Sequence, residues 1–431
     1  MSAAKDTPPR EAARVVTLGC RLNTFESEVI REQAQAAGVT DAVIVNTCAV
    51  TAEAERQSRQ TIRRLRREQP KARIIVTGCA AQIAPEKFAG MDEVDRVVGN
   101  AEKLDMKVLS GKDPALAFSG ILAGDGAGGE AGANFTAPIL GGFKDRTRAF
   151  VQVQQGCGHR CSFCIVPFAR GPNHSAPEAR IIEQARRLAA NGHREIVLTG
   201  ADVSSYGVDV NGRPGLGHLA GRLLRDVPEL ERLRLTSLDP AIWDDALFEL
   251  LTEEPRFMPH LHLSLQSGSD VILKRMKRRH SRASALDLCN RARRARPGVT
   301  FGADLIAGFP TETGAMFGET LSAIEDFGLT YLHVFPYSKR PGVAAARMPQ
   351  VPARERKRRA AALRQAGDRA LARYLESQVG AQARVLVEKD RRGHSAHFAP
   401  VSLAFDSTPG VILDVNVTAV EDGRLIGEKP T

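Results

Sequence analysis

Residues 156–164 read GCGHRCSFC and directly follow a strand-like run at residues 149–154. The stretch carries three cysteines on one short loop with the spacing C-x3-C-x2-C, namely Cys157, Cys161 and Cys164. Three thiolates placed in this way can bind three corners of a cubane iron–sulfur cluster and leave its fourth iron open to a small molecule. Zinc would need a fourth ligand, and His159 lies awkwardly between the cysteines for that role.

The cysteine loop opens a series of strand-like runs that alternate with helical patterns. The runs occupy residues 149–154, 195–199, 232–237, 261–265, 301–306 and 331–335. The helical patterns between them include residues 177–191, 241–252, 281–294 and 312–327. Six successive βα units predict an open, barrel-like parallel sheet, two units short of a full eight-stranded barrel.

The first hundred residues predict a smaller parallel α/β layer. Strand patterns at 14–18, 42–46 and 73–77 are joined by helical stretches at about 24–37 and 51–69. One cysteine follows each strand, giving Cys20, Cys48 and Cys79. Right-handed crossovers make such strands parallel, so their carboxyl ends share one edge of the sheet. Each thiol alone could be a core residue, but together they predict a second three-cysteine cluster site.

The remaining sequence divides the chain further. A Gly/Ala-rich stretch at 110–142 predicts a flexible linker, and 353–378 predicts a long basic helix. The last fifty residues hold short β runs between Gly, Asp and Pro, which favours a small all-β barrel. The expected parts are 12–109, 110–142, 143–375 and 376–431. Cys289, on the apolar side of its helix and without a partner at ligand spacing, is expected to pack in the core.

Composition limits the class of protein. A hydrophobic fraction of 43% and a charged fraction of 26% are typical of a soluble globular chain. There is no signal-peptide pattern and no apolar run long enough to span a bilayer, so a cytoplasmic protein without membrane contact is expected. In a reducing compartment, seven cysteines favour metal binding over disulfides. The net charge of +10 favours an acidic partner such as nucleic acid, although a generally basic surface is the alternative.

These motifs together resemble a known family. GCGHRCSFC, with Phe163 before its last cysteine, resembles the radical S-adenosylmethionine (SAM) superfamily. The segments TLGCRLNTFESE, VNTCAVT, VTGCAAQ and VVGN resemble the methylthiotransferases within it. GCRLN, LTGADVSSYG and HVFPYSKRPG are most similar to the threonylcarbamoyladenosine tRNA methylthiotransferases. The resemblance covers nearly the whole chain and implies a radical-SAM partial barrel followed by a TRAM-like β-barrel.

The resemblance also implies two [4Fe–4S] clusters with different roles. The cluster on Cys157, Cys161 and Cys164 would bind SAM and release a 5′-deoxyadenosyl radical. The cluster on Cys20, Cys48 and Cys79 would carry the sulfur to be inserted, and a second SAM would supply the methyl group. Further cofactor contacts are expected near the loop and at the strand ends of the barrel, at Phe163, Gly200, Ser237, Gln266 and Gly308. For the glycines, simple turn formation is the alternative.

The same resemblance implies tRNA as the substrate, methylthiolated at C2 of N6-threonylcarbamoyladenosine 37, and basic side chains favour a nucleic-acid partner. Helix 51–69 carries an arginine stripe opposite Ile62 and Leu65, formed by Arg56, Arg59, Arg63, Arg66 and Arg67. Such a stripe can contact phosphates, although a merely solvated face is the alternative. The runs KRMKRR (274–279) and RERKRR (354–359) add two basic patches. Near the barrel mouth, Arg170 or Arg340 could pair with the threonyl carboxylate.

Other partners and functions stay open at this point. An electron donor such as flavodoxin or ferredoxin and a sulfur source are expected. The same chemistry on N6-isopentenyladenosine of tRNA, or on an aspartate of a ribosomal protein, is an alternative. A non-catalytic iron–sulfur or zinc protein that binds RNA is an alternative of another class.

Overall fold

A computed structural model of the chain describes residues 11–111, 138–144 and 146–430. These residues divide into two compact units. The first unit takes the described residues up to 111 together with Ile165–Gly171, and the second unit takes the others. Most of the predicted linker, namely residues 112–137, lies outside the described residues.

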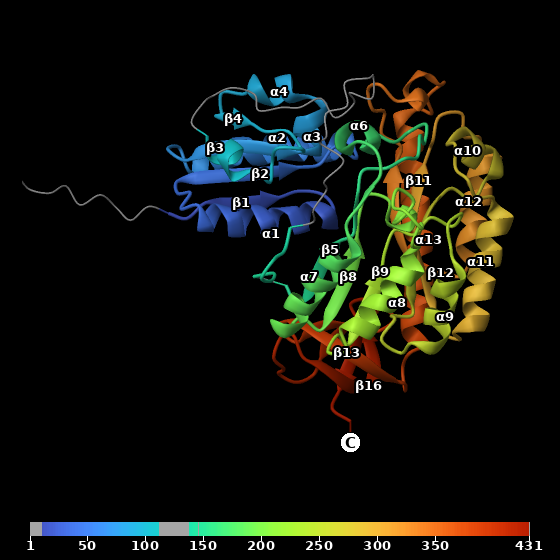
Figure 1. Ribbon diagram of the computed structural model, residues 1–431. Coiled ribbons are helices and arrows are strands. Elements are labelled where there is room, and N and C mark those ends of the chain that lie inside the picture. Colours follow the sequence, from blue (N-terminus) through green and yellow to red (C-terminus); the bar gives the residue numbers. More distant parts are fainter. Residues whose placement is uncertain (1–10, 112–137, 145, 431) are drawn as a thin grey trace, which may run out of the picture. The chain divides into compact units, whose positions relative to one another are not determined.

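The first unit is a parallel α/β layer with strand order β1-β2-β3-β4 (Figure 1). Its strands are β1 (Arg14–Thr17), β2 (Ala42–Thr47), β3 (Arg73–Gly78) and β4 (Arg96–Val97). Its helices are α1 (Arg21–Ala36), α2 (Ala52–Glu68), α3 (Cys79–Ile83), α4 (Pro85–Ala89), α5 (Met106–Ser110) and α6 (Val166–Arg170). The predicted parallel layer is therefore confirmed.

Helix α2 shows why these elements form where the sequence places them. The Thr51 side chain accepts a hydrogen bond from the Ala54 amide at 3.1 Å, which caps the first turn. Glu53 and Glu55 occupy that turn, where carboxylates favour the positive end of the helix dipole. The apolar side of the helix is buried in the core of the unit.

The second unit is built on six parallel strands in the order β5-β8-β9-β10-β11-β12. They are β5 (Arg148–Gln152), β8 (Glu195–Thr199), β9 (Arg232–Leu235), β10 (His260–Gln266), β11 (Thr300–Ala307) and β12 (Leu329–Pro336). A parallel bridge between Leu238 and Leu263 joins the two three-stranded halves. The predicted open (βα)6 barrel is confirmed.

Helices follow these strands as in other βα repeats (Figure 1). They are α7 (Glu178–Ala190), α8 (Leu216–Asp226), α9 (Asp245–Glu253), α10 (Asp270–Arg275), α11 (Arg282–Ala295), α12 (Gly314–Asp326) and α13 (Ala353–Glu376). A short antiparallel pair, β6 (Gln154–Gln155) with β7 (His174–Ser175), flanks the cysteine loop. Cys289 on α11 is fully buried, as expected for a packing residue.

The C-terminal strands form a closed five-stranded barrel in the order β13-β14-β15-β17-β16. They are β13 (Gln382–Lys389), β14 (Arg392–Ser395), β15 (Pro400–Leu403), β16 (Ile412–Glu421) and β17 (Arg424–Glu428). Their inward residues, such as Val385, Val401 and Val415, form a core of their own. The small β-barrel expected from the composition is therefore present.

This small barrel closes the amino-terminal end of the parallel sheet, which we call the floor. The buried Arg232 and Arg234 share Glu195 and donate hydrogen bonds to backbone carbonyls of the C-terminal barrel region. Phe398 stacks on His260 with ring centroids 4.9 Å apart. The charges of these two arginines are thus balanced within the parallel sheet, and the last domain of the chain supplies hydrogen-bond acceptors for them.

Among the helices of the described residues, none combines the length and the apolar character that a membrane crossing requires.

Candidate active site

The first cysteine site lies at one edge of the N-terminal sheet. Cys20, Cys48 and Cys79 follow β1, β2 and β3 directly, where parallel topology brings strand ends together. Cys20 is the N-cap of α1 and Cys79 is the first residue of α3. Cys48 and Cys79 are buried, whereas Cys20 is exposed. The arrangement agrees with the convergence that the sequence predicts.

Two glycines make this convergence sterically possible. Gly19 has φ +101°, and a Cβ there would lie 2.8 Å from the Cys48 sulfur. Gly78 has φ +94°, and a Cβ there would lie 2.5 Å from the Thr47 amide nitrogen. Only glycine tolerates both this backbone conformation and this close approach. The dipeptide Gly-Cys at both positions therefore has a steric cause.

A buried ionic cluster adjoins these thiols. Arg170 Nη1 lies 2.8 Å from Glu26 Oε1, and Lys103 Nζ lies 2.5 Å from Glu26 Oε2. The three charged side chains are at most 3% exposed. Burial by itself raises the pKa of Glu26, but the two cations outweigh it and lower that pKa to about 2. Burial lowers the pKa of Lys103, whereas the pKa of Arg170 is raised, despite its burial, by the negative charges of Cys79, Glu26 and Cys20. When both side chains are protonated, two cations face one carboxylate and leave a surplus positive charge within electrostatic range of Cys20 and Cys79.

Asn100, from the VVGN segment, ties the ionic cluster to the cysteine edge. Its side-chain amide contacts the Cys79 sulfur at 3.7 Å and donates to the Ala169 carbonyl at 2.7 Å. Its carbonyl oxygen accepts a hydrogen bond from Lys103 at 2.8 Å. This network holds helix α6, and with it Arg170, in the first unit.

The residues of this edge fit an anionic iron–sulfur cluster. A four-iron cluster with three thiolate ligands carries about one net negative charge, which the surplus cation can balance. Burial raises the pKa of Cys48 to about 12, so a metal must displace the proton from that thiol when it binds. Three sulfur donors for four irons leave one iron available to another ligand.

The second cysteine site is local to one loop in the second unit. Ser162, inside the loop, donates its amide to the Met276 carbonyl at 3.0 Å and its hydroxyl to the Arg275 carbonyl at 2.7 Å. The Ser162 carbonyl accepts a hydrogen bond from the Ala345 amide at 2.8 Å. The loop is therefore fixed from two sides by segments that follow β10 and β12.

Charged side chains surround this loop as well. Arg278 lies 3.7 Å from the Cys161 sulfur and 3.0 Å from Asp239. Cys157 lies 3.7 Å from Asp202, and burial together with this carboxylate raises the pKa of the Cys157 thiol. Beside the loop, Arg278 and Asp239 thus lie near Cys161 and Asp202 lies near Cys157, and the three thiols again supply the donor set of a four-iron cluster.

His159, considered above as a zinc ligand, contacts Asp202 and Ser205. Its Nε2 lies 2.9 Å from Asp202 and 3.4 Å from the Ser205 hydroxyl. Asp202 and Ser205 both belong to the motif LTGADVSSYG, quoted above for its resemblance. This motif therefore supplies two polar groups that contact the cysteine loop.

Comparison with known proteins decides the family. A model of the radical SAM superfamily matches residues 151–324, and a model of the uncharacterised protein family UPF0004 matches residues 12–99. The chain is 45% identical to the threonylcarbamoyladenosine tRNA methylthiotransferase MtaB of Rickettsia prowazekii (strain Madrid E), over 95% of this chain and 96% of that protein. The chain belongs to the threonylcarbamoyladenosine tRNA methylthiotransferase family.

Further relatives place the family in context. The MtaB protein of Aquifex aeolicus (strain VF5) is 34% identical over 87% of this chain and 92% of its own length. A tRNA-2-methylthio-N(6)-dimethylallyladenosine synthase of Novosphingobium aromaticivorans is 34% identical over 91% of this chain and 89% of its own length. The solved radical SAM methyltransferase TsrM of Kitasatospora setae shares the fold, with a TM-score of 0.54, 15% identity, and coverage of 78% of this chain and 74% of that one. Radical SAM methylthiotransferases use SAM and [4Fe–4S] clusters.

In this methylthiotransferase, three of the expected cofactor positions lie at bent strand ends. Ser237, Gln266 and Gly308 follow or end β9, β10 and β11 with φ of +57°, +70° and +70°. For a residue other than glycine this conformation costs about 1–2 kcal/mol. Such strain is concentrated at functional sites, so the bends are consistent with the expected cofactor contacts, which stay predictions.

The other two expected cofactor positions have contacts within the chain. Phe163 packs edge-on against Phe309 with ring centroids 6.4 Å apart. A Cβ at Gly200 would lie 2.7 Å from the Gln154 side-chain oxygen, so glycine is needed there to admit Gln154. Their contacts with SAM also stay predictions.

Most arginines of the stripe on α2 are paired with carboxylates of the chain, which the sequence alone does not show. Its members Arg56, Arg59 and Arg63 lie 2.7, 2.9 and 3.6 Å from the carboxylates of Glu53, Glu55 and Glu93. Arg66 is turned inward and binds backbone carbonyls and Asp95. A surface hollow of about 430 Å³ on the same helix is lined by Gln57, Gln60, Thr61, Arg63, Arg64 and Arg67.

The two basic runs form smaller surface patches than expected. Arg278 of the first run is buried beside Asp239, and Arg359 of the second lies 2.7 Å from the buried Glu312. Arg170 is committed to the ionic cluster of the first unit, and Arg340 is 3% exposed. Arg278 and Arg359 pair with internal carboxylates, a use that a run of like charges in the sequence does not reveal.

Proposed function

We propose that this chain adds a methylthio group to C2 of N6-threonylcarbamoyladenosine at position 37 of tRNA. The observation that carries this proposal is the pair of three-thiol sites in two separately folded units. The relatives named for this reaction, matched over 87–95% of the chain, support the choice of substrate. The alternative nucleoside, N6-dimethylallyladenosine, is named for relatives at 34–35% identity.

The proposed roles of the chain's own residues follow from their positions. When bound, SAM and the cluster on Cys157, Cys161 and Cys164 supply the one-electron chemistry that activates an unreactive C–H bond. Ser162 and its backbone partners hold that loop rigid, and Arg278 offsets negative charge beside Cys161.

In the first unit, Cys20, Cys48 and Cys79 would hold the second cluster, the site for the inserted sulfur. Arg170 and Lys103 balance its charge while Glu26 fixes both cations. An electron donor such as flavodoxin or ferredoxin and a separate sulfur source complete the proposed reaction. On the surface, Arg56, Arg59 and Arg63 would contact the tRNA backbone.

The test is mass spectrometry of tRNA nucleosides from a host strain whose own enzyme for this modification has been deleted. Expression of the chain is expected to restore 2-methylthio-N6-threonylcarbamoyladenosine. A chain with Cys157, Cys161 and Cys164 replaced by Ala serves as the control. If only the dimethylallyl nucleoside gains a methylthio group, or neither does, the proposed substrate is wrong.

A further inference from the structure

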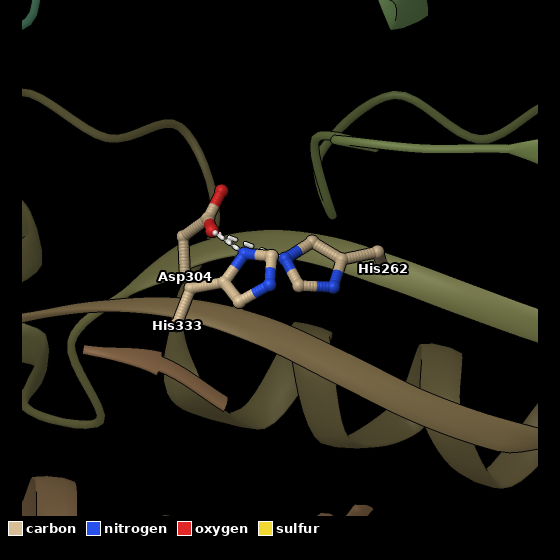
Figure 2. A group of neighbouring side chains, drawn as sticks. All are labelled: His262, Asp304 and His333. Atoms are coloured by element: carbon tan, nitrogen blue, oxygen red, sulfur yellow. Dashed lines mark hydrogen bonds and ion pairs between the residues drawn. The ribbon is translucent and has the colours of Figure 1, made fainter. Parts of the chain in front are cut away.

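Three side chains of metal-ligand type, none of them a cysteine, gather on one face of the parallel sheet of the second unit (Figure 2). The strand register places Asp304 on β11 opposite His333 on β12. It places His262 on β10 opposite Gly302, two residues before Asp304. Residues two apart on a strand share a face, so the three side chains project to the same side.

The geometry of the three groups is that of a chelating set. His262 Nε2 and His333 Nδ1 each lie 3.1 Å from the same atom, Asp304 Oδ1. One ligand atom from each residue lies within 4.8 Å of the other two. A tetrahedral ion with bonds of about 2.0–2.1 Å separates its ligand atoms by about 3.3 Å. The side chains therefore need only small shifts to surround an ion.

Gly302 allows this arrangement. A Cβ at this position would lie 2.3 Å from His262 Nδ1, closer than any side chain could approach. With glycine there, the imidazole of His262 can lean across β11 toward Asp304. The backbone is thus adapted to the position of this ring.

The three residues occupy a layer inside the partial barrel. Asp304 shares its face with Ile306, which packs in one apolar cluster with Phe163 of the cysteine loop. His260 and Tyr331 share the same face two residues toward the floor. The layer lies between the floor and the cysteine loop, which follows the carboxyl end of β5, the end of the strands where barrel enzymes place their active sites.

The layer is open on one side. The His262 side chain is 5% exposed, Asp304 is 22% exposed and His333 is 53% exposed. An ion held here would keep at least one coordination position for a ligand from outside the chain.

We propose that His262, Asp304 and His333 bind a divalent transition-metal ion of the zinc class, as a third site distinct from both cysteine sites. Two imidazoles and one carboxylate are a common ligand set for Zn²⁺ and Fe²⁺ in sites that keep an open position. The open position takes an oxygen ligand from water or from a molecule bound in the barrel. The cysteine sites, with thiolate donors only, serve iron–sulfur clusters instead.

The experiment titrates the holoenzyme, with both clusters loaded, with Zn²⁺ in a buffer of controlled free zinc, and counts zinc and iron per chain. One zinc is expected beyond the unchanged iron content. Asp304→Asn and His333→Ala are each expected to weaken zinc binding by at least roughly 100-fold. His333 is half exposed, so its variant tests the site with little risk to folding. His218→Ala, a surface histidine on α8, is the matched control and is expected to bind zinc normally.

X-ray absorption at the zinc edge identifies the ligands directly. The proposal expects nitrogen and oxygen at about 2.0–2.1 Å and no sulfur at about 2.3 Å. It is overturned if the holoenzyme binds no zinc, if the Asp304 and His333 variants bind it as tightly as the parent, or if the zinc carries sulfur ligands. None of these readouts depends on methylthiolation, so the proposed function is tested separately.

Discussion

The two cysteine sites hold the same donor set but are built in opposite ways. The loop site places Cys157, Cys161 and Cys164 within eight consecutive residues, 157–164. The N-terminal site collects its three cysteines from three strand ends, where the glycines before Cys20 and Cys79 permit close packing. One site is a property of a single loop, whereas the other exists only once a sheet has formed.

The charge around the two sites differs as well. In the loop site Arg278 faces Asp239, and a second carboxylate, Asp202, lies beside Cys157. In the N-terminal site Glu26 faces both Arg170 and Lys103, so one positive charge is left over in a nearly dry environment. An anionic occupant such as an iron–sulfur cluster would balance this charge and keep Lys103, whose pKa burial lowers, protonated. This contrast predicts that the two sites respond differently to mutation and to pH.

The largest effect is expected from removal of the loop site. Replacing Cys157, Cys161 and Cys164 together by Ala should lower the iron content from about eight to about four per chain and abolish SAM cleavage. The measurements are iron analysis and chromatography of 5′-deoxyadenosine after anaerobic reduction. A triple variant that still forms 5′-deoxyadenosine would show that the radical chemistry starts elsewhere.

The matching variant of the N-terminal site should separate the two roles. With Cys20, Cys48 and Cys79 replaced by Ala, about half of the iron should again be lost and no methylthio product should form. Some 5′-deoxyadenosine should remain, because the loop site is anchored within its own unit. Methylthiolated tRNA from this variant would contradict an auxiliary role for the N-terminal cluster.

Arg170→Gln tests the surplus charge. Removing a buried cation disfavours the more negative, reduced cluster, so the midpoint potential should fall by on the order of 100 mV. The titration is followed by electron paramagnetic resonance in the variant that lacks the loop cysteines, which leaves one cluster to observe. Arg67→Gln, on an exposed part of α2, is the control and should leave the potential unchanged. An unchanged midpoint potential in Arg170→Gln would mean that the charge of Arg170 does not affect the reduction of the cluster.

The smallest expected effect is a pH dependence of stability through Glu26. The pKa of Glu26 is about 2 in the folded chain and ordinarily about 4.5, so its ion pairs stabilise the fold fully above pH 4.5. This contribution, roughly 3 kcal/mol, is lost as the pH falls from 4.5 to 2. Urea unfolding of the cluster-free chain at several pH values measures it. The stability difference between the parent and Glu26→Gln should shrink across this window, and a constant difference would refute the assignment.

The sequence predicted the strands closely, because buried parallel strands are nearly continuous apolar runs. The run 42–46 became β2 (Ala42–Thr47), and 195–199 matches β8. The two cysteine sites were also predictable, one from local spacing and the other from the rule that parallel strands end at one edge. Local pattern and simple topology were sufficient for these features.

The charge partners could not be predicted in the same way. Arg170 meets Glu26 across 144 residues, and Arg278 meets Cys161 across 117. Ion pairs at such separations depend on the packing of finished elements, and the sequence shows only that the residues are basic. The runs that contain Arg278 and Arg359 were read as surface patches for that reason, although both side chains are buried against carboxylates. The His262, Asp304 and His333 layer was missed because its members lie inside strands and not at their ends, and the sequence does not give the register that aligns them.

The hydrogen bonds at the floor of the parallel sheet join residues that are synthesised far apart in time. Arg232 and Arg234 are made early, but their backbone acceptors at Arg384, His394 and Ala396 leave the ribosome more than 140 residues later. Until then a nascent chain carries two guanidinium groups with only Glu195 to share, at a position that the finished fold keeps dry. The floor therefore gains its final hydrogen bonds only once β13 and β14 have been made. A product truncated before β13 is expected to be cleaved by proteases faster than the parent chain, because these buried guanidinium groups then lack their backbone acceptors.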